Sequence, residues 1–434
     1  MSTVTTPTPA EQGGLAPDTA ITPTRSAGAR KLTIIFGVMA ALLAVTLLRS
    51  SHQGDTTFQL AADTDFVTLP DVTVPSMVTA WLMVLVCVGV LAESVRRMLA
   101  HVRQPVWLPI AFALAWMVGF LSWAAADGRI RVVSLFAGAV ALAIPLVFGA
   151  LGGVLGERAG VVNIAIEGQL LFGAFAAAIT ASLTGSPWAG LVAAMLAGAL
   201  MALILGLFSI TYFVDQVIVG VVLNVLAVGL TNFLFRQVLT PNADSLNAPA
   251  GFDRLPIPVL GDIPLVGPIL FRQTALVYVL YAVVALVAYA LYRTRWGLRV
   301  RAVGEHPKAA DTVGIRVNRT RYRTILLAGA IAGMGGAYYT LVAVNQFNRE
   351  MTGGAGYIAL AAVIFGKWDP IRATLAALLF GFATNLQGVL SAIGSPVPSQ
   401  FMLMLPYLVT IFAVAGLVGR SRPPAADGVP YKPQ

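Results

Sequence analysis

The chain has 434 residues, of which 58% are hydrophobic and only 11% are charged, and its mean hydropathy is +0.82. Soluble globular domains carry about a quarter of their residues as charges, so this composition excludes that class and indicates a polytopic membrane protein. The net charge of +9 does not indicate a nucleic-acid partner, because most basic residues lie in short loops beside apolar segments.

Twelve apolar segments follow a tail at 1–31 that is rich in Thr, Pro, Ala and Gly, a composition that predicts disorder. Most segments are near the roughly 20 residues that cross a hydrocarbon core. Lipid offers no partner for backbone polar groups, so they should be helices, and the predicted fold class is an all-α membrane bundle. The expected spans are 32–48, 76–92, 107–126, 132–151, 162–184, 188–210, 216–236, 274–292, 324–345, 354–366, 373–393 and 401–419.

The number of spans is twelve by this count, and ten is also possible. Span 354–366 is short enough to be re-entrant, and only three residues separate 162–184 from 188–210. Removing two spans together leaves the predicted sidedness of both termini unchanged.

Loop charges predict that both termini are cytoplasmic, in a multi-pass protein of the cell membrane. Basic residues precede the first span, and loop 293–323 holds nine of the 28 Lys and Arg residues. Loop 49–75 carries four aspartates and falls on the other side, as does the long, nearly neutral loop 237–273. This is the pattern in which positive loops stay inside.

Loop 293–323 also contains a predicted short helix at 307–313. Pro307 stands where a first helical turn accepts proline, and Gly314 stands where a helix end favours glycine. An apolar face for a partner's groove is expected from Ala309, Ala310, Val313 and Ile315. The alternative is an ordinary solvated, positively charged loop.

The stretch GEHPKAADTVGI in this loop resembles the coupling loop of ABC importer permeases, which docks on the ATP-hydrolysing subunit. The matching residues are Lys308, Ala309, Ala310 and Gly314, with Lys308 in place of the family's first acid. The resemblance implies a coupling role for the loop residues Gly304, Glu305, Pro307, Lys308, Ala309, Ala310 and Gly314.

Three further stretches resemble permeases for nucleosides and simple sugars, in the ribose-permease superfamily. They are GERAGVVNIAIEGQLLFGAFAA, DQVIVGVVLNVLAVGLTNFL and GAGYIALAAVIFGKWDP. The resemblance covers about 131–420, which implies a permease core there, an accessory membrane region at 32–130 and a cytoplasmic tail at 421–434. It is nearest to one subunit of the paired nucleoside permeases.

This resemblance implies several partners: a cytoplasmic ATPase, an extracytoplasmic substrate-binding protein and a second permease subunit. It favours a heterodimer of two different permease subunits over a homodimer. The substrate would be a nucleoside or a related simple sugar. The residues alone leave nucleosides, nucleobases and pentoses open, because a few amide and carboxylate groups suit all three.

Polar residues within the apolar spans are the candidates for a substrate pathway. Asn163 and Glu167 are four residues apart and should share one helical face, whereas Glu157 and Arg158 are expected in headgroups or water. A buried carboxylate is costly, so Glu167 should have a partner, either as a bracket between helices or as a pathway residue. The candidate set is Asn163, Glu167, Gln169, Asn224, Asn345 and Gln346.

No motif indicates catalysis, a metal site or a cofactor. The three histidines are scattered, and no G-x-x-x-x-G-K-[ST] phosphate loop occurs, so ATP hydrolysis is expected on a separate chain. The competing function is an ion-coupled secondary transporter, for which Glu167 and Asp215 are the acids that could couple an ion gradient.

Overall fold

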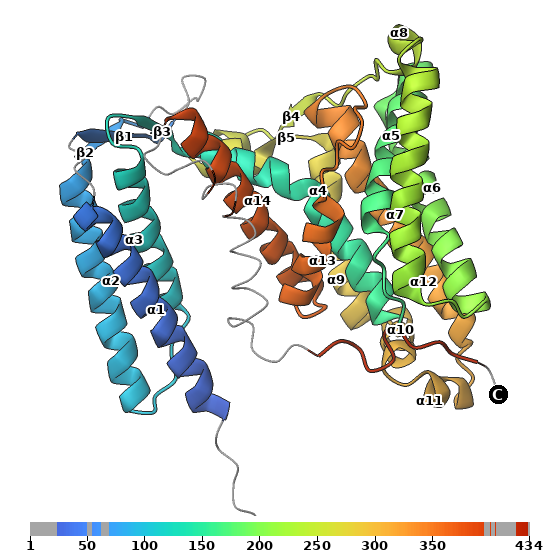
Figure 1. The fold of residues 1–434 in the computed structure, drawn as a ribbon, viewed down its shortest axis with the longest axis horizontal. Coiled ribbons are helices and arrows are strands. Elements are labelled where there is room, and N and C mark those ends of the chain that lie inside the picture. Colours follow the sequence, from blue (N-terminus) through green and yellow to red (C-terminus); the bar gives the residue numbers. More distant parts are fainter. Residues whose placement is uncertain are drawn as a thin grey trace, which may run out of the picture.

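The computed structural model describes residues 24–49, 54–61, 69–394, 400, 404 and 422–432. Within them, ten helices are long and apolar enough to cross a membrane, and they confirm the all-α bundle (Figure 1). The long helices are α1 Thr24–Arg49, α2 Ser76–Leu99, α3 Trp107–Ala124, α4 Val132–Arg158, α5 Ile166–Thr184, α6 Pro187–Gly206, α7 Gln216–Leu234, α9 Ala275–Arg293, α12 Val317–Tyr338 and α14 Pro370–Ala392.

Two of the twelve predicted spans have no long helix here. The prediction at 354–366 corresponds to α13, Ala355–Phe365, whose 11 residues make only about 16 Å of helix. The prediction at 401–419 lies outside the described residues, apart from position 404.

Shorter elements connect or extend these helices. Two small sheets stand at one end: β1 (Asp55–Gln59) pairs antiparallel with β2 (Val72–Pro75) and parallel with β3 (Arg129–Arg131), and β4 (Arg254–Pro256) pairs antiparallel with β5 (Arg272–Thr274). The other short pieces are α8 Ala243–Leu246, α10 Arg295–Glu305, α11 Pro307–Thr312, the 3-10 turn Leu260–Asp262, and π-helical turns at Leu207–Thr211, Phe235–Leu239, Gly267–Phe271 and Tyr339–Ala343.

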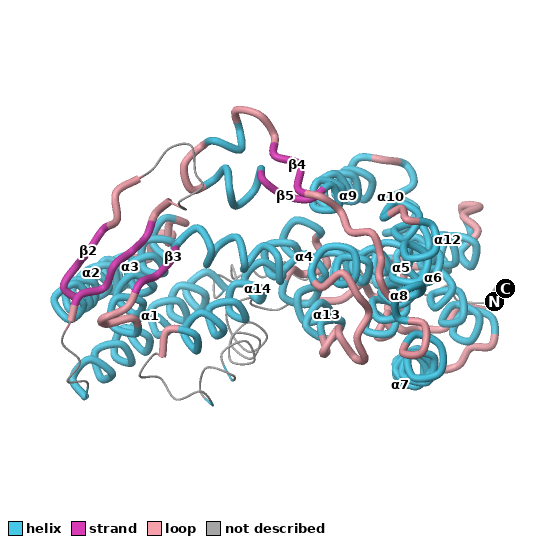
Figure 2. Tube along the Cα trace, turned by 90° about the horizontal axis from the view of Figure 1, so that it is seen from above, coloured by secondary structure: helices cyan, strands magenta, loops and turns pink. Residues whose placement is uncertain are grey.

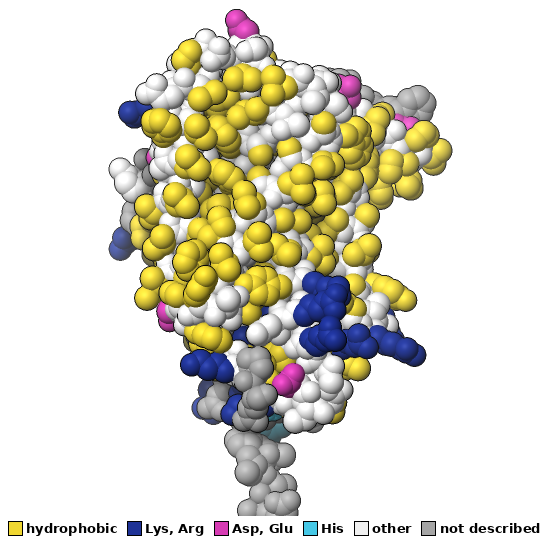
Figure 3. Space-filling model, turned by 90° about the vertical axis from the view of Figure 1, so that its right-hand side faces the viewer, with side chains coloured by type: hydrophobic (Ala, Val, Ile, Leu, Met, Phe, Trp, Pro, Cys, Tyr) yellow, Lys and Arg dark blue, Asp and Glu magenta, His cyan; other side chains and the backbone are white. Residues whose placement is uncertain are grey.

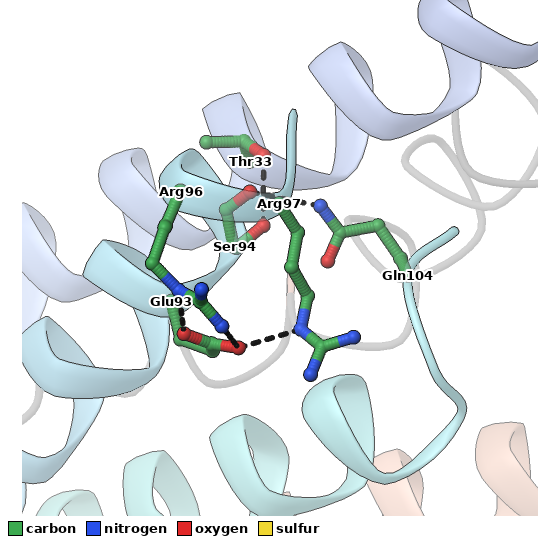
Figure 4. Close-up of polar contacts among 6 residues, drawn as sticks. All are labelled: Thr33, Glu93, Ser94, Arg96, Arg97 and Gln104. Atoms are coloured by element: carbon green, nitrogen blue, oxygen red, sulfur yellow. Dashed lines mark hydrogen bonds and ion pairs between the residues drawn. The ribbon is translucent and has the colours of Figure 1, made fainter. Parts of the chain in front are cut away.

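Helices α1 to α3 form a bundle beside the rest of the protein (Figures 1 and 2). The bundle meets α14 through an apolar cluster in which Leu386 and Leu390 join residues of α1, α2 and α3. Figure 4 shows the opposite end of the bundle, where the Thr33 and Ser94 hydroxyls are 2.8 Å apart and Glu93 accepts hydrogen bonds from two neighbouring arginines. The apolar cluster at α14, together with the contacts that β1 and β3 make with α4, holds the bundle to the larger body.

The larger body is centred on α5 and α12, which pack against α4 and α6. Gly329 and Gly333 let α12 approach α6 closely: a Cβ on Gly333 would lie 2.1 Å from the carbonyl oxygen of Ala194. Small residues at such contacts are the usual means of tight helix packing in membranes. Helix α7 is packed on one side only and lies at the periphery (Figure 2).

Two crossings of this body are broken rather than continuous helices. The chain leaves α4 at Arg158, and α5 begins only at Ile166, so residues 161–163 are neither helix nor strand where a helix from 162 was predicted. A second non-helical stretch, 344–354, precedes α13. Non-helical backbone at membrane depth is tolerated only inside protein or beside a water-filled cavity. These breaks therefore direct attention to the place where they meet.

Candidate functional site

The two breaks meet at Glu167, in the first turn of α5. Its carboxylate also caps α13: Oε1 accepts hydrogen bonds from the Thr352 hydroxyl at 2.6 Å and the Gly354 amide at 2.9 Å, and Oε2 accepts one from the Gly356 amide at 2.6 Å. A helix N-terminus carries unpaired N–H groups and a partial positive charge. Glu167 thus lies between two such ends, and in the part of the chain that the structure describes its hydrogen-bond donors are a hydroxyl and two backbone amides.

Close approach of α13 to α5 depends on a glycine. A Cβ on Gly356 would lie 2.3 Å from the backbone nitrogen of Glu167 and 2.5 Å from its Cα. Backbone atoms cannot yield as a flexible side chain can. Only glycine at this position permits the carboxylate to reach the start of α13.

Amide side chains stabilise the broken crossing before α5. Asn224 on α7 accepts a hydrogen bond from the Gly168 amide at 2.8 Å and donates to the carbonyl oxygen of Ile164 at 2.9 Å. Asn163 and Gln169 are fully buried and bond each other reciprocally, at 3.0 and 3.1 Å. Asn163 is not helical, so the prediction that it shares a helical face with Glu167 was wrong.

A cavity of about 330 Å³ opens beside these groups. Of the predicted residues, Glu167 and Asn224 line it, and they are joined by Glu350, Thr352 and Tyr357, which the sequence reasoning missed. The missed residues belong to the second break and to the first turn of α13. Their only signal was the polar run before Gly353 and Gly354.

The remaining candidates lie elsewhere. Asn345 and Gln346 are exposed, beyond the end of α12 that is far from α10 and α11. Asp215 is the N-cap of α7, where its Oδ1 accepts bonds from the amides of residues 217 and 218 at 2.8 and 3.1 Å. The structure thus brings together Glu167 and Asn224 but not Asn345 or Gln346.

Glu157 is buried, so the expectation of a water or headgroup location was wrong for this residue, whereas Arg158 remains partly exposed. Glu157 is 3% exposed and accepts a hydrogen bond from the Trp368 indole, and Arg158 Nε donates to the Trp368 carbonyl oxygen at 2.9 Å. This pair ties the end of α4 to the turn after α13. The local sequence pattern could not predict a hydrogen-bond partner more than 200 residues away in the chain.

The short helix predicted in loop 293–323 is confirmed as α11. Pro307 is its first residue, and Gly314 has φ +82°. The Gly314 amide donates to the Asp311 carbonyl at 2.9 Å, and the Ile315 amide donates to the Ala310 carbonyl at 3.0 Å. These two bonds are the Schellman arrangement that ends a helix at glycine.

The predicted apolar face of this loop is divided between two directions. Ala310 is buried against Val303 and Val317, whereas Ala309 is exposed and Val313 is 75% exposed. The expectation of a single outward face was therefore wrong. Gly304 sits on the inner side, where a Cβ would lie 2.2 Å from the carbonyl oxygen of Arg158.

Basic side chains gather around α11. A hollow of about 280 Å³ is lined by Arg299, Arg316, Arg319 and Arg323. Figure 3 shows Lys and Arg side chains below a broad apolar surface. We call the part of the molecule that carries α10 and α11 the basic end. The residues that the structure describes contain no group of three or more His, Cys, Asp or Glu side chains placed to hold a metal ion.

Comparison with known proteins places this arrangement in a family. The profile of the family described as "Branched-chain amino acid transport system / permease component" matches residues 135–414. The chain belongs to this permease family. The permease is 43% identical over 298 residues to the guanosine ABC transporter permease protein NupQ of Bacillus subtilis, covering 67% of this chain and 93% of NupQ.

Other relatives of the permease have similar descriptions. The nucleoside ABC transporter permease protein NupC of Lactococcus lactis is 40% identical over 296 residues, covering 66% of this chain and 93% of NupC. The putative glucose ABC transporter permease protein TsgC13 of Haloferax volcanii is 34% identical over 304 residues, covering 65% of this chain and 91% of TsgC13. No solved structure matches the chain.

The resemblance drawn from four sequence motifs is thereby confirmed. The protein is a multi-pass permease subunit of an ABC transporter in the cell membrane, and a transport component by family. Bacillus subtilis has a second relative, the guanosine ABC transporter permease protein NupP, at 25% identity over 297 residues, covering 65% of this chain and 83% of NupP.

Proposed function

We propose that this permease forms half of a pathway that imports a nucleoside, or a related simple sugar, delivered by an extracytoplasmic binding protein and driven by a separate cytoplasmic ATPase. The observation that carries the proposal is the cavity where the two broken crossings meet, whose wall carries the polar side chains of Glu167, Asn224, Glu350 and Tyr357. Discontinuous helices whose N-termini point to one mid-membrane site are typical of transporters. The guanosine and nucleoside descriptions of NupQ and NupC support the substrate class.

The cavity offers the polar chemistry that a ribose needs. Glu350 presents an exposed carboxylate, and the Tyr357 hydroxyl lies 3.1 Å from Asn224 Nδ2. Such groups can donate and accept hydrogen bonds with sugar hydroxyls. Glu167 already accepts three hydrogen bonds from the protein, so its role is to shape the wall, as Asn163 and Gln169 fix the chain behind it.

A second permease subunit would complete the pathway against α7. Its outward side is apolar, with Ile218, Val222 and Val225 all about 60% exposed or more, and Val225 also lines the cavity. A partner packed there would turn an open cavity into an enclosed passage. The NupP and NupQ pair favours a heterodimer.

The basic end faces the cytoplasm in this proposal, because arginines at span ends stay inside. Asn345 and Gln346 then lie at the outer side, where substrate would arrive. The N-terminal bundle, 32–130, lies beside the core as an accessory membrane anchor, and the opening tail is cytoplasmic.

Loop 293–323 couples ATP hydrolysis to the pathway in this proposal. Helix α11 presents Ala309 and Lys308 outward for docking, with Glu305, Pro307, Ala310 and Gly314 setting its shape. Gly304 of α10 packs directly on Arg158 at the end of α4. The non-helical segment that leads from there to α5 and Glu167 follows immediately. Movement of α10 would therefore reach the cavity wall through the segment 158–165.

Uptake assays with three variants test this function. Gly314→Pro removes an amide donor and cannot adopt φ +82°, so it should abolish uptake while the protein remains in the membrane. Ala309→Glu should have the same effect through the docking surface. Gly314→Asn keeps the backbone amide and is the side chain that best tolerates this left-handed conformation, so it should retain far more uptake than Gly314→Pro. Uptake that survives loss of the ATPase but stops with a proton uncoupler would instead establish the ion-coupled alternative.

A further inference from the structure

A segment near the end of the chain lies across the basic end of the permease. Residues 422–432, which we call the clasp, have no helix or strand but are held by named contacts. Its first attachment is to the end of α10: the Ala426 amide donates to the Gly304 carbonyl at 2.9 Å, and the Ala425 amide donates to Glu305 Oε2 at 3.2 Å. The Gly304 carbonyl is among the last of α10, which have no partner within the helix, and Glu305 adds a side-chain acceptor beside it.

The clasp is attached again to α11 itself. The Tyr431 hydroxyl donates to Asp311 Oδ2 at 2.7 Å, and the Tyr431 ring is buried with Val303, Ala310 and Val317. One stretch of chain therefore holds the coupling helix on both sides. A helix of six residues has little stability of its own, so these contacts contribute to its orientation.

A buried arginine fixes the centre of the clasp. Arg321 of α12 is 1% exposed and donates to the carbonyl oxygens of Val429 at 3.0 Å and Ala426 at 3.4 Å. Gly160 packs beside both, because a Cβ there would lie 2.8 Å from Arg321 Nη2 and 3.0 Å from the Ala426 oxygen. The clasp thus supplies acceptors for a guanidinium that is buried in the folded protein, where a charge without hydrogen-bond partners is costly.

The clasp and α11 together line an open groove of about 410 Å³. The clasp supplies Ala425, Ala426 and Val429, and the coupling loop supplies its other wall: Glu305, His306, Pro307, Lys308 and Ala309. Val429 is 50% exposed at the end of the molecule where solvent-facing loops are otherwise rich in arginine. An apolar groove continuous with the docking helix is suited to the same partner.

We propose that the clasp is a second element of the ATPase-docking surface: it sets the orientation of α11 and forms, with α11, the groove that receives a segment of the ATPase subunit. This inference rests on the proposed function. It places part of the docking surface more than 100 residues after the coupling loop.

The interaction is tested on the intact transporter purified with its ATPase. Val429→Cys, labelled with a benzophenone maleimide, should photo-crosslink to the ATPase subunit. Val344→Cys is the matched control, since Val344 is equally exposed, at 47%, but lies at the opposite end. Crosslinking no greater at residue 429 than at residue 344 would overturn the inference.

The positioning role is tested by uptake. Tyr431→Phe keeps the ring but removes the bond to Asp311, and should lower uptake about fivefold at unchanged membrane abundance and unchanged substrate KM. Asp311→Asn keeps an acceptor oxygen for the hydroxyl and should stay near wild type. If Tyr431→Phe has wild-type uptake and Ala309→Glu still abolishes uptake, the inference about the clasp is overturned and the proposed function stands. If Ala309→Glu also leaves uptake unchanged, the proposed function itself fails.

Discussion

Replacing Glu167 by glutamine tests whether a carboxylate between two helix ends stabilises the fold. In its best orientation the glutamine side chain keeps its oxygen as the acceptor for Thr352 and Gly354. Its NH₂ group then faces the Gly356 amide, so two donors meet and that hydrogen bond is lost. Loss of one hydrogen bond to a charged group costs about 1.5–3 kcal/mol. Loss of the charge at two helix N-termini adds about 0.3–1 kcal/mol at each.

The desolvation of the carboxylate works in the other direction, because a neutral amide is cheaper to bury. We therefore expect a net loss of about 1–3 kcal/mol in the free energy of unfolding for Glu167→Gln. Thermal unfolding of the purified protein in detergent, followed by intrinsic fluorescence, should give a melting temperature several degrees below wild type.

Glu350→Gln is the matched control for this experiment. It makes the same chemical change on the same cavity, but Glu350 is exposed and its Oε1 accepts a hydrogen bond from the Asn232 amide at 3.0 Å. Its melting temperature should stay close to wild type while uptake falls. Equal melting temperatures for Glu167→Gln and wild type would refute the reasoning that the carboxylate stabilises the junction of α5 and α13.

Two further predictions concern packing and pH. Gly356→Ala should prevent folded protein from accumulating in the membrane, because the added Cβ would meet the backbone of Glu167. The control Gly388→Ala should be tolerated, because a Cβ there has no atom within 4 Å. Immunoblots and gel filtration compare the two variants, and equal amounts of folded protein would contradict the packing argument. Burial raises the pKa of Asp427 to about 7, although Arg321 opposes the shift. A carboxyl with a raised pKa in the docked state favours docking at low pH and loses that contribution as pH rises toward 7. Limited proteolysis of the clasp should therefore be faster at pH 7.5 than at pH 5.5, and Asp427→Asn should remove most of the difference. An unchanged difference in Asp427→Asn would contradict the assignment of this pH dependence to Asp427.

The long helices and α11 were predictable because their signals are local. An apolar run of about 20 residues has one stable form in lipid, and Pro307 with Gly314 marks both ends of a short helix. The same runs concealed the breaks. Residues 161–165 are as apolar as the helix that follows, so hydropathy alone extended that helix four residues too far.

The polar site could be predicted only in part, because its bonds join distant parts of the chain. Glu167 was expected to need a partner, but the donors that satisfy it lie 185 to 189 residues away. Glu157 meets Trp368 across 211 residues. Local spacing shows that a group needs a bond, whereas tertiary packing decides which group supplies it.

The shortness of α13 bears on how the chain enters the membrane. Eleven apolar residues are too few to insert as an independent segment, and the polar stretch before them has unpaired backbone groups until Glu167 and its neighbours surround it. This crossing must therefore be completed after α4, α5 and α12 are in the bilayer. The order of synthesis fits that requirement, because those three helices precede α13 in the chain and emerge from the ribosome first.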